Sequence, residues 1–232
     1  MLIDAVEAGA GRDDPLVLDL GCGPGSLAVR LLDRIPAARV VAIDTDPLLL
    51  ALGRAAHGDR PGLRFADQDL RVPGWAGRLG LSRAADAAVS TTALHWLSAG
   101  ELWAMYAELA TVLRPGGLLL DGDHLREDEA AVPGLARLGD AVSERAVRRQ
   151  VDGQEGTRVD WKTWWVAATA APELAGPAAE RARRRLSEDH HGSESVLLLV
   201  QHVAALRAAG FAEIGTLWQY GENRILCAIM PG

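Results

Sequence analysis

Lysine and cysteine are scarce in this chain of 232 residues. Lys162 is its one lysine, which leaves little room for a Schiff-base mechanism. The two cysteines, Cys22 and Cys227, are too few for a disulfide framework and form no CxxC pair that could hold a metal. We therefore expect a protein of a reducing compartment.

Long apolar runs and clustered positive charge are also missing. No stretch reaches the roughly 18 apolar residues of a membrane span, and Asp4 and Glu7 stand where a secretion signal would be basic and then apolar. The net charge of −7 argues against nucleic acid as a partner, because phosphates are bound by clustered Lys and Arg. The densest basic run, residues 181–185, is interpreted as a solvated helix face. These absences predict a cytoplasmic protein without membrane or nucleic-acid partners.

Short apolar runs alternate with helical patterns in the first half of the chain, which is typical of βαβ units and a parallel sheet. Asp46 is expected to cap the second helix, and Ser98 with Glu101 forms the capping box of the third. The Arg-Pro-Gly-Gly sequence at 114–117 is expected to stop that third helix. The order predicts a doubly wound α/β domain. The expected strands are residues 16–20, 39–43, 63–66, 86–90 and 118–121, and the expected helices are residues 26–35, 47–56 and 99–113.

The second half of the chain is organised differently. Residues 124–192 lack strand patterns and are rich in Ala, Arg and Glu, so we interpret them as a helical cap inserted into the α/β domain of residues 1–123 and 193–232. A helix over 195–209 and a hairpin of residues 213–219 and 224–230 would follow, extending the sheet with an antiparallel strand. About 15 residues precede the first strand. If the site is open without ligand, we expect this N-terminal segment and the cap to be mobile.

Three alternating glycines follow the first strand. Gly21, Gly23 and Gly25 remove side chains where the backbone turns into a helix, so a ligand can approach closely. The alternative is a tight turn with no ligand. Asp44 ends the second strand about 20 residues further on, where a carboxylate can accept hydrogen bonds from ribose. Ser26 stands where a dinucleotide-binding turn has its third glycine, which favours an adenosine ligand without a pyrophosphate.

Five motifs in order resemble those of the class I S-adenosylmethionine-dependent methyltransferases. Residues 94–97 (Leu-His-Trp-Leu) and the C-terminal hairpin are similar to small-molecule methyltransferases of the trans-aconitate methyltransferase type. The resemblance implies a Rossmann-like, seven-stranded, mostly parallel sheet, S-adenosyl-L-methionine as methyl donor and a small-molecule acceptor. The five motifs are residues 17–25 (VLDLGCGPG), 41–44 (VAID), 65–70 (FADQDL), 86–90 (DAAVS) and 113–117 (LRPGG).

The resemblance also assigns contacts along the first two motifs. Asp19 would hold the methionine ammonium of the cofactor, and the three glycines would line its amino-acid and ribose portions. Asp44 would bind the ribose hydroxyls, and Thr45 would lie against the adenine.

The third and fourth motifs complete this implied cofactor site. Asp69, with Leu70 beside it, would accept a hydrogen bond from the adenine amino group, and Asp67 is the alternative for that role. Ser90 and Thr91 would face the methyl group that is transferred.

The acceptor side is less defined by the sequence. Methyl transfer needs an oriented acceptor, and it needs a base only where the attacking atom must lose a proton. His95 and His124 follow strand ends on the ligand side, so each is a candidate base or substrate ligand, or else a packed loop histidine. Trp96 is a further candidate, and Trp161 and Trp165 share one helix face in the insertion, where they would anchor the cap or line an acceptor pocket.

Two other functions stay open at this point. A nicotinamide-dependent oxidoreductase would need a Tyr-x-x-x-Lys or equivalent set, and neither Tyr106 nor Tyr220 has a suitably placed lysine. A methyltransferase-like scaffold could instead bind the cofactor or a partner protein without turnover. Asp123 and His124 are too few ligands for a metal site, so no metal is predicted.

Overall fold

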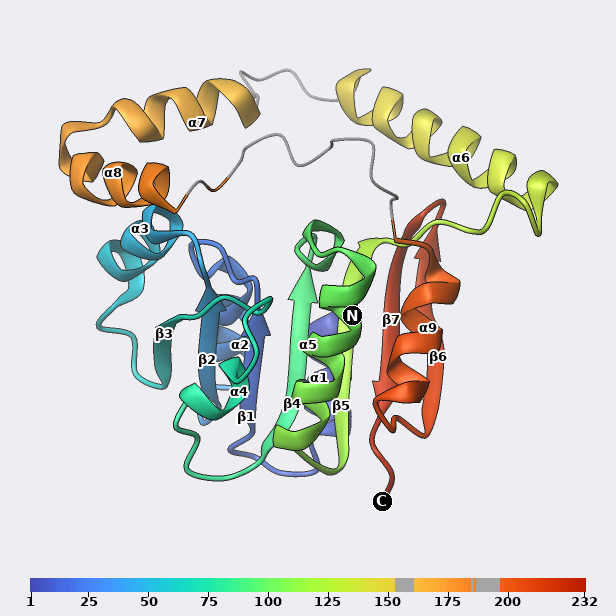
Figure 1. The fold of residues 1–232 in the computed structure, drawn as a ribbon, viewed down its shortest axis with the longest axis horizontal. Coiled ribbons are helices and arrows are strands. Elements are labelled where there is room, and N and C mark those ends of the chain that lie inside the picture. Colours follow the sequence, from blue (N-terminus) through green and yellow to red (C-terminus); the bar gives the residue numbers. More distant parts are fainter. Residues whose placement is uncertain (153–160, 185, 187–196) are drawn as a thin grey trace.

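The computed structural model describes residues 1–152, 161–184, 186 and 197–232. Within them, seven strands form one sheet in the order β3-β2-β1-β4-β5-β7-β6 (Figure 1). Strand β7 runs antiparallel to both β5 and β6, while the other pairs are parallel. This confirms the predicted doubly wound, mostly parallel sheet. The strands are β1 (Leu16–Leu20), β2 (Arg39–Asp44), β3 (Leu63–Asp67), β4 (Ala85–Thr91), β5 (Leu113–His124), β6 (Glu213–Tyr220) and β7 (Asn223–Ile229).

Helices cover both faces of this sheet, so that two apolar clusters are buried, one on each side. Strands buried on both faces read as near-continuous apolar runs, which is the pattern of β1, β2 and β4. One cluster packs under α1 (Leu2–Gly9), α2 (Ser26–Arg34) and α3 (Pro47–His57). The other packs under α4 (Trp75–Arg78), α5 (Ala99–Val112) and α9 (Leu199–Ala208).

Two elements differ from the sequence analysis, which predicted no helix before β1 and a later start for β5. The segment before β1 forms helix α1, whose Leu2 and Val6 are buried and which contacts β5. Strand β5 begins at Leu113, five residues before the expected 118–121, because Leu113 pairs with Ala85 ahead of an irregularity in the ladder. The amide of Gly116 donates to the carbonyl of Pro231 at 2.9 Å, so the Pro-Gly-Gly sequence is held by the chain's C-terminal end.

Within the described part of residues 124–192, a loop of residues 125–132 follows β5, and most of the remaining residues are helical, as expected. Helices α6 (Pro133–Asp152), α7 (Trp161–Ala170) and α8 (Ala175–Arg183), with the short η2 (Pro172–Leu174), arch over the carboxyl ends of the strands (Figure 1). The helix expected over 195–209 begins at Leu199, and residues 195–196 lie outside the described residues. None of the described helices is long and apolar enough to cross a membrane.

At the opposite end of the sheet, Asp86 joins three parts of the chain. Its buried carboxylate accepts hydrogen bonds from the Leu16 amide at 2.8 Å, from Arg83 at 2.5 Å and from Arg114 at 2.9 Å. Arg114 also donates to the carbonyl of Ala10 at 2.8 Å, just after α1. The fourth and fifth sequence motifs therefore meet far from the carboxyl ends of the strands, where they tie the sheet together.

Candidate active site

A cavity of about 640 Å³ opens at the carboxyl ends of β1, β2 and β4. The sheet order reverses between β1 and β4, and open α/β sheets bind ligands at such a switch point. The glycine turn, the end of β2, the loop after β3 and the loop after β4 form its floor and walls. Side chains from α7 and α8 cover it from above. The geometry brings residues from three sequence motifs, from the end of β4 with the loop after it, and from the predicted cap to one place.

The glycine turn adopts the backbone shape that its glycines allow. Gly21, Gly23 and Gly25 have φ angles of 69°, 53° and 86°, a region that strains other residues. A Cβ atom at Gly21 would collide with the Cβ of Ala93, so the two loops can approach only because a side chain is absent there. Gly21 and Gly23 line the cavity, whereas Gly25 does not line it and instead precedes helix α2.

Asp44 ties the end of β2 to this turn and lines the cavity. Its carboxylate accepts hydrogen bonds from the Gly23 amide at 2.7 Å and the Asp46 amide at 2.8 Å. Burial raises the pKa of Asp44, and these two amides only partly oppose the rise. A carboxylate has about four acceptor positions, so Asp44 can still accept hydrogen bonds from a ligand. Thr45 lines the cavity beside it.

Asp19 lies on β1, two residues before the turn, and does not line the cavity. It is 1% exposed, and among the described residues its Oδ2 atom has no hydrogen-bond partner. Burial raises its pKa to about 7, and the nearby charge of Asp44 adds to the rise. A buried, unsatisfied carboxylate next to a ligand cavity is suited to a positively charged group, which would satisfy it directly or through water.

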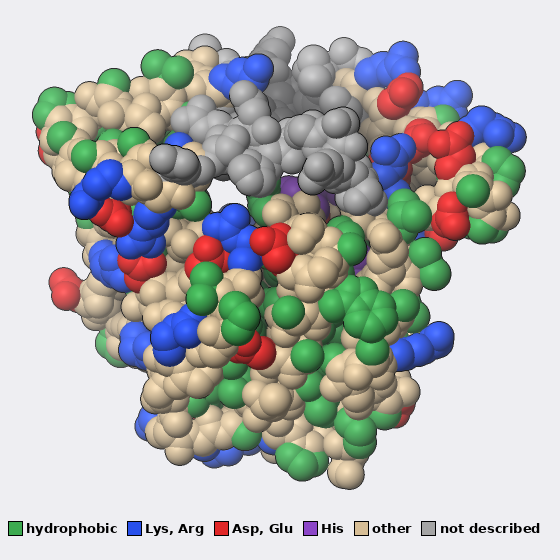
Figure 2. Space-filling view, in the orientation of Figure 1, with side chains coloured by type: hydrophobic (Ala, Val, Ile, Leu, Met, Phe, Trp, Pro, Cys, Tyr) green, Lys and Arg blue, Asp and Glu red, His purple; other side chains and the backbone are tan. Residues whose placement is uncertain are grey.

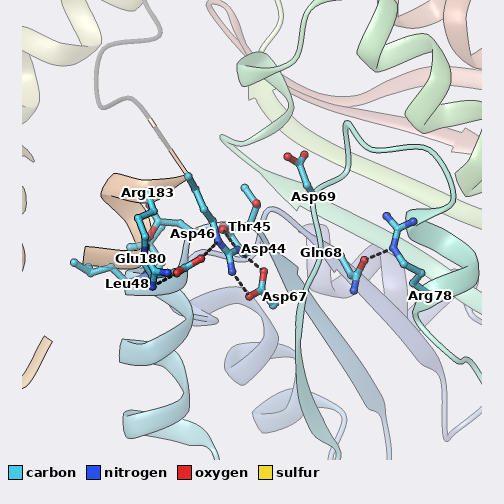
Figure 3. A network of polar contacts seen from close by, with 12 residues as sticks. Asp44, Thr45, Asp46, Leu48, Asp67, Gln68, Asp69, Arg78, Glu180 and Arg183 are labelled. Carbon is cyan, nitrogen blue, oxygen red and sulfur yellow. Dashed lines mark hydrogen bonds and ion pairs between the residues drawn. The ribbon is translucent and has the colours of Figure 1, made fainter. Parts of the chain in front are cut away.

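The two residues that were candidates for binding adenine, Asp67 and Asp69, have different positions. Asp69 and Leu70 line the cavity, whereas Asp67 does not. Figure 3 shows Asp69 pointing away from the contacts around Asp67, with Gln68 turned toward Arg78. Arg71 binds Asp69 with two hydrogen bonds of 2.9 and 2.7 Å. Burial opposes the ionisation of Asp69, but the hydrogen bonds of Arg71 outweigh it and lower the pKa.

The end of β4 supplies a strained loop. Thr91 and Thr92 line the cavity, and Thr92 has a φ angle of 50°, unusual for a residue with a branched side chain. Ser90 does not line the cavity, because its buried hydroxyl donates to the carbonyl of Leu20 at 2.9 Å and so joins β4 to β1. Of the two residues expected to face the transferred methyl group, Thr91 lines the cavity and Ser90 does not.

His95 lies in the cavity wall, and its imidazole is oriented by a buried carboxylate. Nδ1 of His95 lies 2.8 and 3.0 Å from the two carboxylate oxygens of Asp123, which is 3% exposed. Burial would raise the pKa of Asp123, but the hydrogen bond and charge of His95 lower it overall. An ionised Asp123 fixes the proton on Nδ1 and leaves Nε2 free to accept one.

The neighbours of this pair have different positions. Trp96 lines the cavity with its ring 5.3 Å from that of His95. His124 is exposed and does not line the cavity, although its ring centroid lies 6.5 Å from that of His95. Its backbone amide donates to Asp123 at 2.7 Å. Of the two candidate histidines, only His95 can contact a ligand in the cavity.

The cap reaches the cavity through aromatic and basic side chains. Trp165 is 4% exposed, and the guanidinium of Arg181 lies 4.2 Å from the centre of its ring. Trp164 and Trp165 both line the cavity. Trp161 begins helix α7, and the expectation for its side chain stays a prediction.

Two arginines of the basic run of residues 181–185, at the end of α8, do not lie on the solvated face that we expected. Arg181 is 8% exposed and donates to Asp46 at 2.6 Å, and Arg184 binds Asp67 with two hydrogen bonds of 2.7 and 2.8 Å. Arg184 also donates to the carbonyl of Thr45 at 2.9 Å. The expectation was wrong for Arg181 and Arg184 because their partners lie far away in the sequence, at the ends of β2 and β3. It is confirmed for Arg183, whose side chain is 75% exposed, and residue 185 lies outside the described residues. Basic and acidic side chains lie side by side in this region (Figure 2).

Sequence reasoning did not single out Arg71, Thr92 or the pairing of Asp123 with His95. The sequence shows Asp123 beside His124 but gives no sign that it faces His95, 28 positions earlier. Trp164 belongs to the same aromatic run as Trp161 and Trp165, on the helix face that was expected to anchor the cap or line an acceptor pocket.

Comparison with known proteins agrees with this geometry. Residues 17–117 match the family model described as a methyltransferase domain. The trans-aconitate 2-methyltransferases of Escherichia coli O139:H28 and Shigella flexneri serotype 5b are each 34% identical over 103 residues, which is 44% of this chain and 36% of those proteins. Residues 17–117 are thus similar to a methyltransferase domain, in agreement with the family that the five sequence motifs resemble. The chain spans about a third of the length of these curated relatives.

Solved methyltransferase structures share the fold of this chain. An O-methyltransferase family protein from Burkholderia thailandensis has a TM-score of 0.61 at 19% identity, covering 100% of this chain and 55% of that one. Human N-acetylserotonin methyltransferase, solved with S-adenosylmethionine, has a TM-score of 0.59 at 14% identity, covering 100% of this chain and 51% of that one. Magnesium protoporphyrin IX methyltransferase from Synechocystis PCC 6803 has a TM-score of 0.54 at 18% identity, covering 99% and 80%.

Proposed function

We propose that this methyltransferase transfers the methyl group of S-adenosyl-L-methionine to a small-molecule acceptor. One observation carries the proposal: a single cavity contains both the glycine turn with Asp44 and the His95 imidazole held by Asp123. The first part is suited to an adenosine ligand, and the second to a group that loses a proton. Residues 124–192 would form the cap over the acceptor.

The residues present fit the cofactor. Asp19 offers a buried, unsatisfied carboxylate oxygen for the methionine ammonium, and Asp44 offers its remaining acceptor positions for ribose hydroxyls. The side-chain-free surface of Gly21 and Gly23 leaves room for the ligand's sugar and amino-acid parts. Asp69 and Leu70 would contact the adenine. When bound, S-adenosylmethionine supplies an electrophilic methyl group.

The chain's own part in the reaction is positioning and proton removal. Thr91 and Trp96 line the space next to His95 and would orient the acceptor. His95 would accept the acceptor's proton at Nε2, and Asp123 would hold the ring and stabilise the imidazolium that forms. His124 lies outside the cavity, so we propose no contact between it and the acceptor.

The partner and the compartment follow from composition. Both cysteines are free, and we propose a reducing, cytoplasmic environment. The net charge of −7 supports a small-molecule acceptor over a nucleic acid.

Binding of S-adenosylhomocysteine to Asp44→Ala tests the cofactor assignment. Loss of a charged acceptor should weaken the affinity about 10- to 100-fold, measured by calorimetry. Asp44→Asn, which keeps the size of the side chain, controls for folding of the turn, and the exposed Asp59→Ala should bind like the unchanged protein. Unchanged affinity in Asp44→Ala, or tight binding of NADH by the unchanged protein, would contradict the proposal.

A further inference from the structure

We infer that the acceptor is a phenol, an acidic hydroxyl group carried on a flat and apolar aromatic body. The inference rests on the proposed function and deepens it. Three features of the cavity support it: its arginines are paired with carboxylates of the chain, its wall contains a proton acceptor, and aromatic side chains line it as well.

Every arginine in the described lining of the cavity is already bound by a carboxylate of the chain. Arg71 binds Asp69 at 2.7 Å, and Arg181 binds Asp46 at 2.6 Å. Arg184 pairs with a third carboxylate, that of Asp67 at the end of β3. An acceptor with a carboxylate would have to break one of these pairs or lose its hydration without compensation. The lining therefore disfavours acids such as trans-aconitate, the compound in the name of the curated relatives.

The His95 pair requires an acceptor that gives up a proton. With Nδ1 of His95 bound to Asp123, the other ring nitrogen is the position that can take a proton inside the cavity. A carboxylate has no proton to give, and an aliphatic alcohol holds its proton much more strongly than a phenol, whose pKa is about 10. General-base catalysis by imidazole is matched to a phenol because proton transfer is then least uphill.

Besides Thr91 and Thr92, the cavity wall contains aromatic and apolar side chains. Trp96 and Leu97 follow His95 in the loop after β4, and Trp164 and Leu186 line the same cavity from the cap. Ring faces of this kind bind planar aromatic groups by burial and stacking. They offer few polar groups that could recognise a sugar or an amino acid.

The reaction balances without a further reactant. The phenol oxygen forms a bond to the methyl carbon, and the carbon–sulfur bond breaks with its electron pair remaining on sulfur. The phenol proton moves to Nε2 of His95 and leaves to solvent after the transfer. The products are a methyl ether, S-adenosylhomocysteine and one proton.

Matched probes test the inference. 2-Naphthol and 2-naphthoate share one flat body and differ in the group they present, and trans-aconitate is a carboxylate without that body. On protein saturated with S-adenosylhomocysteine, calorimetry should show 2-naphthol binding about tenfold or more tighter than either acid. With S-adenosylmethionine, mass spectrometry should detect 2-methoxynaphthalene. Equal or tighter binding of either acid, or no binding of 2-naphthol, would overturn the inference.

Variants separate the roles of the two side chains. His95→Gln should lower kcat for 2-naphthol by about 100-fold or more with little change in KM, and it should flatten the pH profile. Trp96→Ala should raise KM by about tenfold, whereas Trp103→Ala, an exposed tryptophan on α5, should leave it unchanged. If S-adenosylhomocysteine binds and only acids are methylated, the phenol assignment fails and the methyltransferase function stands. If S-adenosylhomocysteine does not bind, the proposed function itself fails.

Discussion

Asp121 lies in a buried polar group behind the active site, together with Tyr106 and His202. The Tyr106 hydroxyl lies 2.8 Å from Nδ1 of His202, which is 3.7 Å from Asp121. Burial raises the pKa of Asp121 well above its usual value, and the charge of Asp123 adds to the rise. Burial lowers the pKa of His202 to about 4. Both shifts favour the uncharged forms, so Asp121 and His202 stay neutral next to the ionised Asp123.

Asp121→Asn should therefore stabilise the protein in a pH-dependent way. A carboxyl whose folded pKa is raised costs stability as the pH rises above its unfolded value of about 4, because the unfolded chain releases the proton first. The amide that replaces the carboxyl cannot ionise, so the free energy of unfolding of the variant should be about 1–3 kcal/mol higher at pH 8 and about equal near pH 4. Urea unfolding at the two pH values measures the difference. A variant that is less stable at pH 8 would show that Asp121 is ionised in the fold.

The roles of single residues were predictable where they depend on nearby sequence. Asp46 caps α3 through the amides of Leu48 and Leu49, and Ser98 with Glu101 forms the predicted capping box. Asp123 is a different case, because its partner is fixed by the parallel pairing of β4 with β5 and by the loop after β4. Pairing across strands is not encoded in spacing.

At the scale of elements, α8 is fastened to the sheet. Its arginines reach the ends of β2 and β3, next to Asp44 and Thr45 in the cofactor region. Helix α8 contacts α3, whose N-cap Asp46 receives one of these pairs. The position of α8 is therefore tied to the part of the cavity that is lined by Asp44 and Thr45.

Arg184→Ala should loosen this attachment. Amide hydrogens of α8 should exchange about three- to tenfold faster, since a partly exposed ion pair contributes about 1 kcal/mol. Added salt should reduce the difference between variant and unchanged protein. Arg183→Ala is the matched control, because the side chain of Arg183 is 75% exposed and pairs within its own helix with Glu180. Equal exchange in Arg184→Ala and Arg183→Ala would show that the contact to Asp67 does not hold α8.

The strands and helices of the first half were predictable because the spacing of apolar residues and the positions of turn residues there indicate the same element boundaries. Helix α1 was not, since eight residues with two buried side chains are marginal alone and depend on β5 for burial. Strand β5 was placed too late because Pro115, Gly116 and Gly117 are usual signals of a turn. Their pairing with the C-terminal end of the chain is a tertiary effect.

At the scale of the whole molecule, the two ends of the sheet have different roles: one end forms the cavity and the other is held together by hydrogen bonds. The carboxyl ends of the strands form the cavity, and the amino ends are joined by Asp86. Burial alone would raise the pKa of Asp86, but the Leu16 amide, Arg83 and Arg114 lower it overall. A carboxyl with a lowered folded pKa stabilises the protein above its unfolded pKa of about 4, and this contribution is lost as the pH falls through the folded value.

Arg114→Ala should separate stability from binding. Loss of one of the donors to Asp86 should cost about 1–3 kcal/mol at pH 7.5, measured as a lower Tm. The difference from the unchanged protein should shrink below pH 4 as Asp86 is protonated. The affinity for S-adenosylhomocysteine should remain within about twofold, because Arg114 lies at the far end of the sheet. A large loss of affinity with an unchanged Tm would contradict this division.

The position of Arg114 also bears on what a match to the fifth sequence motif indicates. The Leu-Arg-Pro-Gly-Gly motif begins β5 at the end of the sheet opposite the cavity, while Asp123 lies near the other end of the same strand. A sequence match to that motif therefore indicates the fold, and it does not indicate which residues take part in a reaction. A protein could retain this signature in full and still become inert through one substitution further along the same strand.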